Sequence, residues 1–230
     1  MTDAQKLMDE GDQANSHNDS SGAIDKYNEA AKKFDEDAAA AEKDAKAATQ
    51  KGDPRAAAEA EEKAAKATAG AAEALDKAAD VAKRFGKLEG KGGASEVFMA
   101  AAKKHQEAAK QFDDAADKYK DANKKQTRAS SLSGVAEMLD SSAGEHMKAS
   151  KSFFEASEVD GKSGKKEEIA EAVKELKQSR DEKPEAKKRY TEAADWHRKA
   201  SKEWEQVGDD KRRDSEYFKA EASEKAAKAL

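Results

Sequence analysis

Apolar residues recur along this chain at intervals of three and four positions, with lysine and glutamate between them. Three stretches show this spacing most clearly: Ala23, Tyr27, Ala30, Ala31 and Phe34; Ala101, His105, Ala108, Ala109, Phe112, Ala116 and Tyr119; and Tyr190, Ala193, Ala194, Trp196, His197, Ala200 and Trp204. The spacing predicts amphipathic helices, and no stretch alternates as a strand would. Because the apolar faces are narrow, each helix needs a neighbouring helix to cover it.

Breaks in this pattern set the expected ends of the helices. They fall at Gly11, 16–22, Gly52-Asp53-Pro54, 86–93, 130–134, 160–164, Pro184 and Gly208-Asp209. Asp53 is expected to cap a helix whose first turn contains Pro54. The predicted helices cover 2–15, 21–51, 54–86, 94–128, 133–159, 165–181, 184–207 and 210–229.

The charges exclude one class of partner. Charged residues make up 40% of the chain, yet 44 Lys and Arg against 49 Asp and Glu leave a net charge of -5. A nucleic-acid-binding protein would carry a net basic surface, so we expect no nucleic acid. The absence of cysteine excludes disulfides and thiolate metal sites. No secretory signal and no run of ~18 apolar residues is visible, so we expect a cytoplasmic protein without membrane contact.

Alanine takes the place of larger apolar residues. Leu, Ile, Val and Phe together number 22 of 230 residues, below the ~20% at which disorder becomes a competing expectation. Alanine favours helix and lets helices approach closely, but each alanine buries little apolar area. The sequence therefore predicts high helicity with thin cores.

The first 34 residues resemble a tetratricopeptide repeat. That repeat places a small residue in its first helix, then a turn, then small, aromatic and small residues in its second helix. Here these places hold Leu7, Gly11, Ala14, Asn18-Asp19, Ala23, Tyr27 and Ala30. A shift of 34 positions aligns Asn18-Asp19 with Gly52-Asp53. In this second unit Glu61 stands at the aromatic position that Tyr27 holds in the first. A third unit places Ser201, Trp204, Gly208-Asp209, Tyr217 and Ala220 similarly, with Arg213 where a small residue is expected.

Two other stretches are similar in style to the SNAP family of SNARE-disassembly adaptors. They are Glu107-Ala108-Ala109-Lys110-Gln111-Phe112, continuing to Ala122, and Tyr190-Thr191-Glu192-Ala193-Ala194-Asp195-Trp196-His197. The family differs in having an apolar first loop where this chain has the polar segment 16–22. The two resemblances imply an all-α fold of stacked antiparallel helix hairpins forming a solenoid that binds a helix or peptide, including a coiled helical bundle. A long antiparallel helical bundle is the alternative.

Catalytic and cofactor chemistry finds little support. Residues 156–163 match the loose phosphate-loop pattern ending in Gly161-Lys162-Ser163, but no strand precedes them, so we interpret them as an inter-helix loop. The four histidines lack the spacing of di-iron or zinc helices and are expected at the surface or at helix interfaces. We therefore predict no enzyme, no cofactor, no metal site and no catalytic residue.

Clusters of basic residues are the candidate partner-binding sites. They are Lys103, Lys104, Lys124, Lys125, Arg128, Lys187, Lys188 and Arg189, with Lys211-Arg212-Arg213 as a further cluster. Gathered on one surface they would attract an acidic helix, whereas separately they are ordinary solvated faces. Trp196, Trp204, Tyr217, Phe153 and Phe154 are expected to be the main packing residues rather than exposed binding residues.

Three functions remain open. The first is an adaptor or scaffold that binds another protein, organised as segments 1–90, 91–160 and 161–230 or as one continuous array. The second is a structural bundle or spacer that associates with copies of itself. The third is a stress or lipid-surface helical protein, suggested by the Ala- and Lys-rich segment 63–70.

Overall fold

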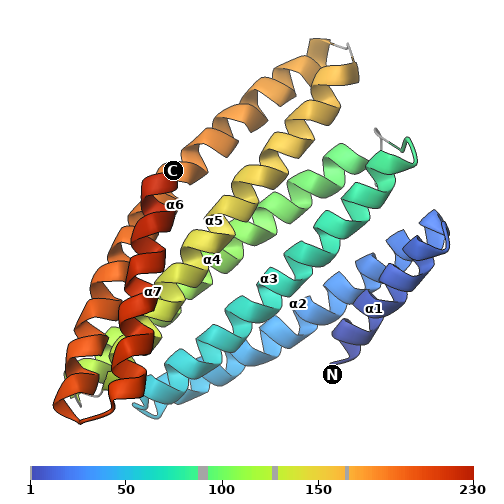
Figure 1. The fold of residues 1–230 in the computed structure, drawn as a ribbon. Helices are drawn as coiled ribbons and strands as arrows, with labels where there is room; N and C mark the ends of the chain where they lie inside the picture. The colour runs from blue at the N-terminus through green and yellow to red at the C-terminus, as the bar shows by residue number, and fades with distance from the viewer. Residues whose placement is uncertain (1, 88–92, 126–128, 164–165) are drawn as a thin grey trace. The chain divides into compact units, whose positions relative to one another are not determined.

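The computed structural model describes residues 2–87, 93–125, 129–163 and 166–230. Over these residues the chain forms seven α-helices and no strand (Figure 1). They are α1 Asp3–Ser16, α2 Ser20–Gln50, α3 Pro54–Arg84, α4 Ala94–Lys125, α5 Ala129–Ser163, α6 Lys166–Gln206 and α7 Asp210–Ala229. Neighbouring helices in the chain run in opposite directions, so the predicted all-α fold of antiparallel helix hairpins is confirmed. No helix among the described residues is apolar enough over a sufficient length to cross a membrane.

The predicted helix ends agree with the structure to within a few residues, but four expected breaks lie inside helices: Gly11, 130–134, 160–163 and Pro184. The expected break at Pro184 is wrong, because α6 continues through this residue. Proline has no N–H, so Pro184 leaves the carbonyl of Arg180 without its hydrogen bond within the helix. Both residues are exposed, so water can donate to this carbonyl instead. The break at 130–134 is also wrong, since α5 already begins at Ala129. The segment 156–163 lies in α5 too, so the loop expected there, and with it the phosphate-loop geometry, is absent.

Three of the inter-helix turns share one construction, which confirms the alignment of these turns in the sequence. Asn18, Gly52 and Gly208 have φ of 60°, 71° and 75°. The aspartate that follows each of them donates its N–H to the carbonyl five residues earlier, at 2.9 to 3.1 Å. The same aspartate caps the next helix by accepting an N–H three residues later, at 2.9 to 3.0 Å. A left-handed residue followed by a capping residue therefore ends one helix and begins the next.

Aromatic residues pack against glycines across neighbouring helices. A Cβ on Gly11 of α1 would lie 2.6 Å from the Tyr27 ring, one on Gly70 of α3 2.8 Å from Phe34, and one on Gly134 of α5 3.0 Å from Tyr119. The missing side chain lets each ring fill the space against the neighbouring backbone. This explains why Gly134 lies inside a helix instead of ending one.

The contacts divide the chain into two compact units, and each unit is described by itself. Unit 1 contains Met1–Ala38, Lys66–Glu107 and Met147–Glu182; unit 2 contains Ala39–Ala65, Ala108–His146 and Lys183–Leu230. Helices α2 to α6 contribute residues to both units. The division into segments 1–90, 91–160 and 161–230 stays a prediction.

Both units have cores in which alanine predominates. In unit 1 the larger buried apolar side chains, among many buried alanines, are Met8, Tyr27, Val81, Phe98, Phe153 and Val159. In unit 2 the larger buried apolar side chains are Phe112, Tyr119, Leu132, Val135, Met138 and Leu139. Polar side chains are buried in both units as well, and they form the clusters described next.

Candidate functional site

Unit 2 contains a pocket of about 520 Å³ that we call the Trp204 pocket. It is lined by Arg55, Glu62, Tyr119, Ser130, Ser133, Gly134, Glu137, Trp204, Arg212, Ser215, Glu216 and Lys219. Most of these residues come from α3, α5 and α7, while α4 and α6 each supply one aromatic residue. The pocket thus combines two aromatic side chains with hydroxyl groups and charges of both signs, a composition suited to an amphipathic group.

The α6–α7 turn places Trp204 and Arg212 in the pocket. Asp209 donates its N–H to the carbonyl of Trp204 at 3.0 Å and caps α7. The guanidinium of Arg212, in the first turn of α7, therefore lies 4.6 Å from the centre of the indole ring. At the edge of the ring the indole Nε1–H donates to Ser133 Oγ at 3.2 Å. The indole is thus held by a cation over its face and a hydroxyl group at its edge.

Tyr119 forms another wall. Its ring lies against Gly134, and its hydroxyl donates to Glu62 Oε2 at 3.0 Å. Burial, followed by the charge of Glu62, raises the pKa of Tyr119 well above its usual value of 10.0. The hydroxyl therefore remains a hydrogen-bond donor throughout the neutral range.

Lys219 lies between two carboxylates of the pocket. Its Nζ is 2.6 Å from Glu137 Oε1 and 3.4 Å from Glu216 Oε1. Burial favours the neutral amine, but the hydrogen bonds and charges of these glutamates outweigh it and raise the pKa of Lys219. The ammonium group is therefore a fixed cation in the wall.

A fully buried histidine lies directly behind this wall. His197 Nδ1 is 2.6 Å from Glu216 Oε2, and His197 Nε2 is 2.9 Å from Asp140 Oδ2. Ser223 Oγ donates to the second oxygen of Asp140 at 2.7 Å. Burial lowers the pKa of His197, but the hydrogen bonds and charges of Asp140 and Glu216 outweigh it, so the pKa is raised above 6.5. The hydrogen bonds and the raised pKa both favour the charged imidazole, which can donate from both nitrogens.

Unit 1 contains a matching cluster. His105 is fully buried and its Nε2 lies 3.0 Å from Asp76 Oδ2, while Ser152 Oγ donates to Asp76 Oδ1 at 2.7 Å. In both units the aspartate, the histidine and the serine come from three successive helices. Activation of a serine nucleophile would require a hydrogen bond from the serine hydroxyl to the histidine. In both clusters the serine hydroxyl is bonded to the aspartate instead. These clusters therefore join helices and lack the geometry of a catalytic triad.

Metal binding needs side chains that converge on one point. Among the described residues no group of three or more His, Asp or Glu does so. Around His197 the two carboxylates lie at opposite nitrogens of the ring. This arrangement satisfies a charged imidazole, whereas a metal ligand must be neutral.

The predicted basic residues are mostly exposed or already paired. Lys103, Lys187 and Lys188 are exposed. Lys104 Nζ lies 2.9 Å from Asp35 and 3.0 Å from Glu107. Arg189 lies 2.7 Å from Asp113 and 3.1 Å from Glu192. Arg128 and the side chains of Lys124 and Lys125 lie outside the described residues.

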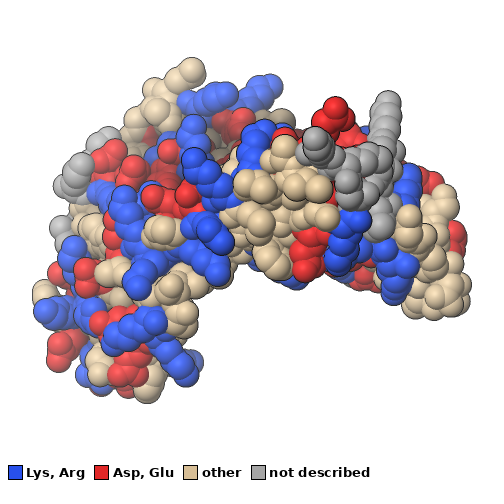
Figure 2. All heavy atoms as spheres, turned by 90° about the horizontal axis from the view of Figure 1, so that it is seen from above, with Lys and Arg blue, Asp and Glu red and all other residues tan. Residues whose placement is uncertain are grey.

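These basic residues do not gather within one unit. Lys103 and Lys104 belong to unit 1, and 187–189 belong to unit 2. Acidic side chains lie beside Lys and Arg over most of the face seen in Figure 2. The role of the basic residues in partner binding stays a prediction.

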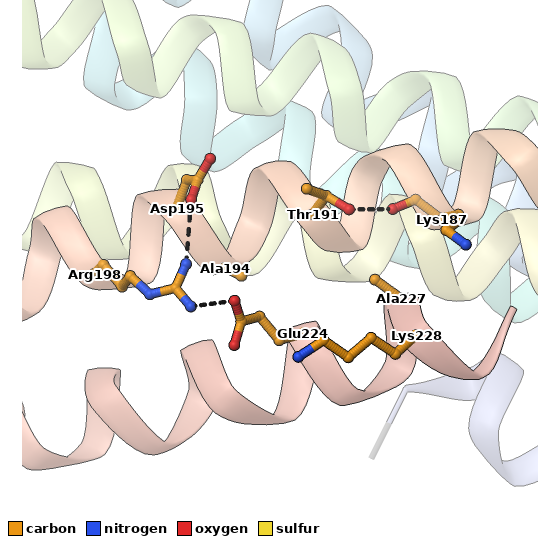
Figure 3. Close-up of a pocket in the computed structure, with 8 residues that line it drawn as sticks. All are labelled: Lys187, Thr191, Ala194, Asp195, Arg198, Glu224, Ala227 and Lys228. Carbon is orange, nitrogen blue, oxygen red and sulfur yellow. Dashed lines mark hydrogen bonds and ion pairs between the residues drawn. The ribbon is translucent and has the colours of Figure 1, made fainter.

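Lys187 lines a smaller pocket of about 200 Å³ between α6 and α7. Figure 3 shows Arg198 beside Asp195 and Glu224, and Thr191 donating to the carbonyl of Lys187 at 2.9 Å. Because this pocket is smaller and has no aromatic residue in its lining, it is a weaker candidate for an amphipathic group than the Trp204 pocket.

The expectation that five aromatics form the main packing residues is wrong for two of them. Phe153 is fully buried, but Phe154 is 45% exposed and Tyr217 is 53% exposed. Successive residues on a helix point about 100° apart, so Phe153 and Phe154 cannot both face the core. Tyr217 is exposed because the buried side of α7 carries Glu216 and Ala220 instead.

The sequence singled out Arg212 within a basic cluster and assigned Trp204 to packing, but gave no sign of Glu137, Glu216 and Lys219. Glutamate and lysine are so frequent in every helix that no local signal separates these three from solvated residues. His197 was expected at the surface or at a helix interface, and the structure buries it fully at an interface. Its two carboxylates come from α5 and α7, 57 and 19 positions away, so no short motif marks them.

Comparisons with known proteins address the fold. No protein-family model and no curated sequence matches the chain. A structure described as "DHF79 filament" is 16% identical, with 99% of this chain and 97% of that chain covered and a TM-score of 0.52. A "de novo designed helical repeat protein DHR64" is 18% identical, with coverages of 98% and 92% and a TM-score of 0.44. The first likeness supports a shared all-α fold and, at this identity, nothing beyond the fold.

Proposed function

We propose that this protein is a non-catalytic interaction scaffold, similar in its mode of binding to tetratricopeptide-repeat and SNAP-type adaptors, and that the Trp204 pocket receives a side chain of a partner helix or peptide. The observation that carries the proposal is the pocket itself. Two aromatic rings give an amphipathic side chain an apolar wall, and Arg212, Glu137 and Ser215 place polar groups at its edge. Aromatic and arginine residues of this kind contribute most of the energy at protein interfaces.

Absence of catalysis is part of the same proposal. Ser152 and Ser223 both bond to aspartates, and His105 and His197 lie fully buried behind other side chains. In the Trp204 pocket the Tyr119 hydroxyl lies 3.0 Å from Glu62, but its raised pKa keeps it protonated, which makes it a poor nucleophile.

The test is selection of binders from a displayed library of random 16-residue peptides against the full chain. Ser215 is exposed at the pocket, so Ser215→Trp fills the pocket without removing a described contact. Selected peptides should bind this variant at least about tenfold more weakly, as for the loss of one interface anchor. The matched control is Ser21→Trp, an exposed serine on α2, which should leave binding unchanged. Equal binding to both variants would contradict the proposed site.

Self-association is a second candidate that one observation favours. Tyr217 and Phe218 on α7 are 53% and 65% exposed and lie edge to face with ring centres 6.0 Å apart. Adjacent exposed aromatics are typical of interaction surfaces. Sedimentation velocity should then show oligomers that grow with concentration and disappear in the Tyr217→Ser, Phe218→Ser double variant. A monomer at all concentrations would exclude this candidate.

A further inference from the structure

Helix α7 is held in unit 2 by few apolar side chains. Its buried residues are Glu216, Ala220, Ser223 and Ala227. Its two large aromatic residues are exposed and contribute little burial. Since apolar burial scales with the area removed from water, two alanines stabilise the docking of a 20-residue helix only weakly. Other interactions must hold this helix in place.

Those interactions are polar and reach α5 and α6. Glu216 bonds to His197, and Ser223 bonds to Asp140. Lys219 of α7 bonds to Glu137 at 2.6 Å. Near the turn, Ser201 Oγ donates to the carbonyl of Arg213 at 3.1 Å. The Glu216–His197 contact, between one fully buried and one nearly buried side chain, is the most sheltered of these ion pairs from solvent.

His197 can satisfy both carboxylates only in its charged form. The charged ring donates from both nitrogens, whereas a neutral ring carries one N–H and turns a lone pair toward the other carboxylate. The charged groups that face it are Asp140 from α5 and Glu216 from α7. Behind them lies Lys219, while Lys120 of α4 lies 6.0 Å from the ring centre of the adjacent Trp196. Loss of the proton would therefore leave Asp140 and Glu216 close together with one donor too few.

We propose that α7 is a pH-controlled strap: charged His197 fastens it between Asp140 and Glu216, and loss of the His197 proton releases α7 and dismantles the Trp204 pocket. Helix α7 supplies Arg212, Ser215, Glu216 and Lys219 to that pocket. Release of the helix would thus remove one wall together with the cation over Trp204. The regulatory part of this inference rests on the proposed function, whereas the release of α7 does not.

The direction of the pH effect follows from two pKa shifts. The pKa of His197 is raised above 6.5, so its contribution to α7 docking is complete below pH 6.5 and is lost as pH rises through the raised value. Burial raises the pKa of Glu216, but the hydrogen bond from His197 and the charge of Lys219 outweigh it and lower the pKa below 4.5. The contribution of Glu216 is therefore complete above pH 4.5 and is lost as pH falls through the lowered value. Docking is strongest between these limits.

A thiol probe measures this release directly, because the chain has no cysteine of its own. Ala220→Cys places a thiol on the buried side of α7, where Ala220 is 1% exposed. The control is Ala64→Cys, a fully buried alanine on α3 in the same unit. The rate of modification by a thiol reagent is measured for both variants from pH 6 to pH 9. The ratio of the two rates cancels the effect of pH on the thiolate itself.

The Ala220→Cys rate should rise relative to the control by at least about tenfold across this range. His197 has one pKa when α7 is docked and a lower one when α7 is released, and each pH unit between them changes the opening equilibrium up to tenfold. Adding Glu216→Gln should abolish most of this rise, since an amide can donate to a neutral ring while Asp140 accepts from it. Asp140→Asn is the second variant if the first lowers the helix content. A ratio that stays constant with pH in the parent protein would overturn the strap.

The same experiment separates this inference from the proposed function. Thiol modification needs no peptide, so a strap that opens with pH stands even if no peptide binds the Trp204 pocket. Conversely, peptide binding that is unchanged from pH 6 to pH 9, with a constant thiol ratio, would keep the scaffold and exclude the strap.

Discussion

Two buried glutamates, one in each unit, differ in what surrounds them. Glu175 on α6 in unit 1 is 1% exposed, and neither of its carboxylate oxygens has a hydrogen-bond partner. Glu216 on α7 in unit 2 is 5% exposed, and its oxygens bond to His197 and Lys219. The two carboxylates are almost equally buried, but only that of Glu216 has hydrogen-bond donors beside it.

The pKa values of the two carboxyls move in opposite directions for this reason. Burial, with further contributions from Asp160 and Glu171, raises the pKa of Glu175 to about 7. Burial alone would also raise the pKa of Glu216, but His197 and Lys219 reverse the effect and lower it. A buried carboxylate therefore weakens unit 1 at neutral pH and fastens a helix in unit 2.

The largest expected effect comes from removing the fastening carboxylate. Glu216→Ala leaves charged His197 buried with one acceptor missing, and breaking such a pair costs about 3–5 kcal/mol. Urea unfolding at pH 6.5, followed by circular dichroism, should show a loss of this size. The control is Glu221→Ala, an exposed residue on the same helix, which should leave the midpoint unchanged. Similar midpoints for the two variants would contradict the role given to Glu216.

In unit 1, replacing the buried carboxylate is expected to stabilise the protein rather than destabilise it. Because the pKa of Glu175 is raised from 4.5 to about 7, the folded protein keeps a proton that the unfolded chain releases. The contribution is favourable below pH 4.5 and is lost as pH rises through 7. Glu175→Gln should therefore stabilise the protein at pH 8, by about 1–3 kcal/mol, and by much less at pH 4. Destabilisation at pH 8 would show that a donor reaches this carboxylate.

Smaller changes in stability are expected at two glycines, one in a crowded position and one with open space around it. Gly11→Ala in unit 1 drives a Cβ to 2.6 Å from the Tyr27 ring, whose hydroxyl is held by Asp12 at 2.6 Å. Overpacking of this kind costs about 1–3 kcal/mol. Gly144→Ala in α5 meets nothing within 4 Å, so helix propensity should stabilise it by about 0.5–1 kcal/mol. Thermal melts that shift in the same direction would contradict the packing argument.

The smallest effect is expected at the surface of the strap. Arg198 on α6 pairs with Glu224 on α7, but both side chains are about two-fifths exposed. Solvent screens such a pair, so Arg198→Ala should leave both the unfolding midpoint and the Ala220→Cys modification rate unchanged. A loss comparable to that of Glu216→Ala would mean that surface charge, rather than the buried cluster, holds α7.

Sequence reasoning reached most of the fold because helix periodicity and turn chemistry are local. The stripe around Tyr27 predicted α2, and Asn18-Asp19, Gly52-Asp53 and Gly208-Asp209 marked three turns that share one geometry. It failed at Pro184 and Gly134, where the local signal for a break was overruled. In the first case the freed carbonyl faces water, and in the second the ring of Tyr119 needs the space.

The candidate site could be predicted only in part. Trp204 and Arg212 stand out because tryptophan is rare and the turn between them is recognisable. The carboxylates of Asp140 and Glu216 do not stand out among 49 acidic residues. Their importance depends on which helices lie beside His197, and that information is spread over about 80 positions of the chain.

The sequence by itself determined that this chain is helical, where most helices begin and end, and that alanine would make its cores thin. Local hydrogen bonding and side-chain periodicity act over a few residues, so they can be read from the residues alone. The tertiary structure decided which of many similar charges are buried and paired. A buried carboxylate destabilises or stabilises the fold according to the hydrogen-bond donors that distant segments bring to it, as Glu175 and Glu216 show.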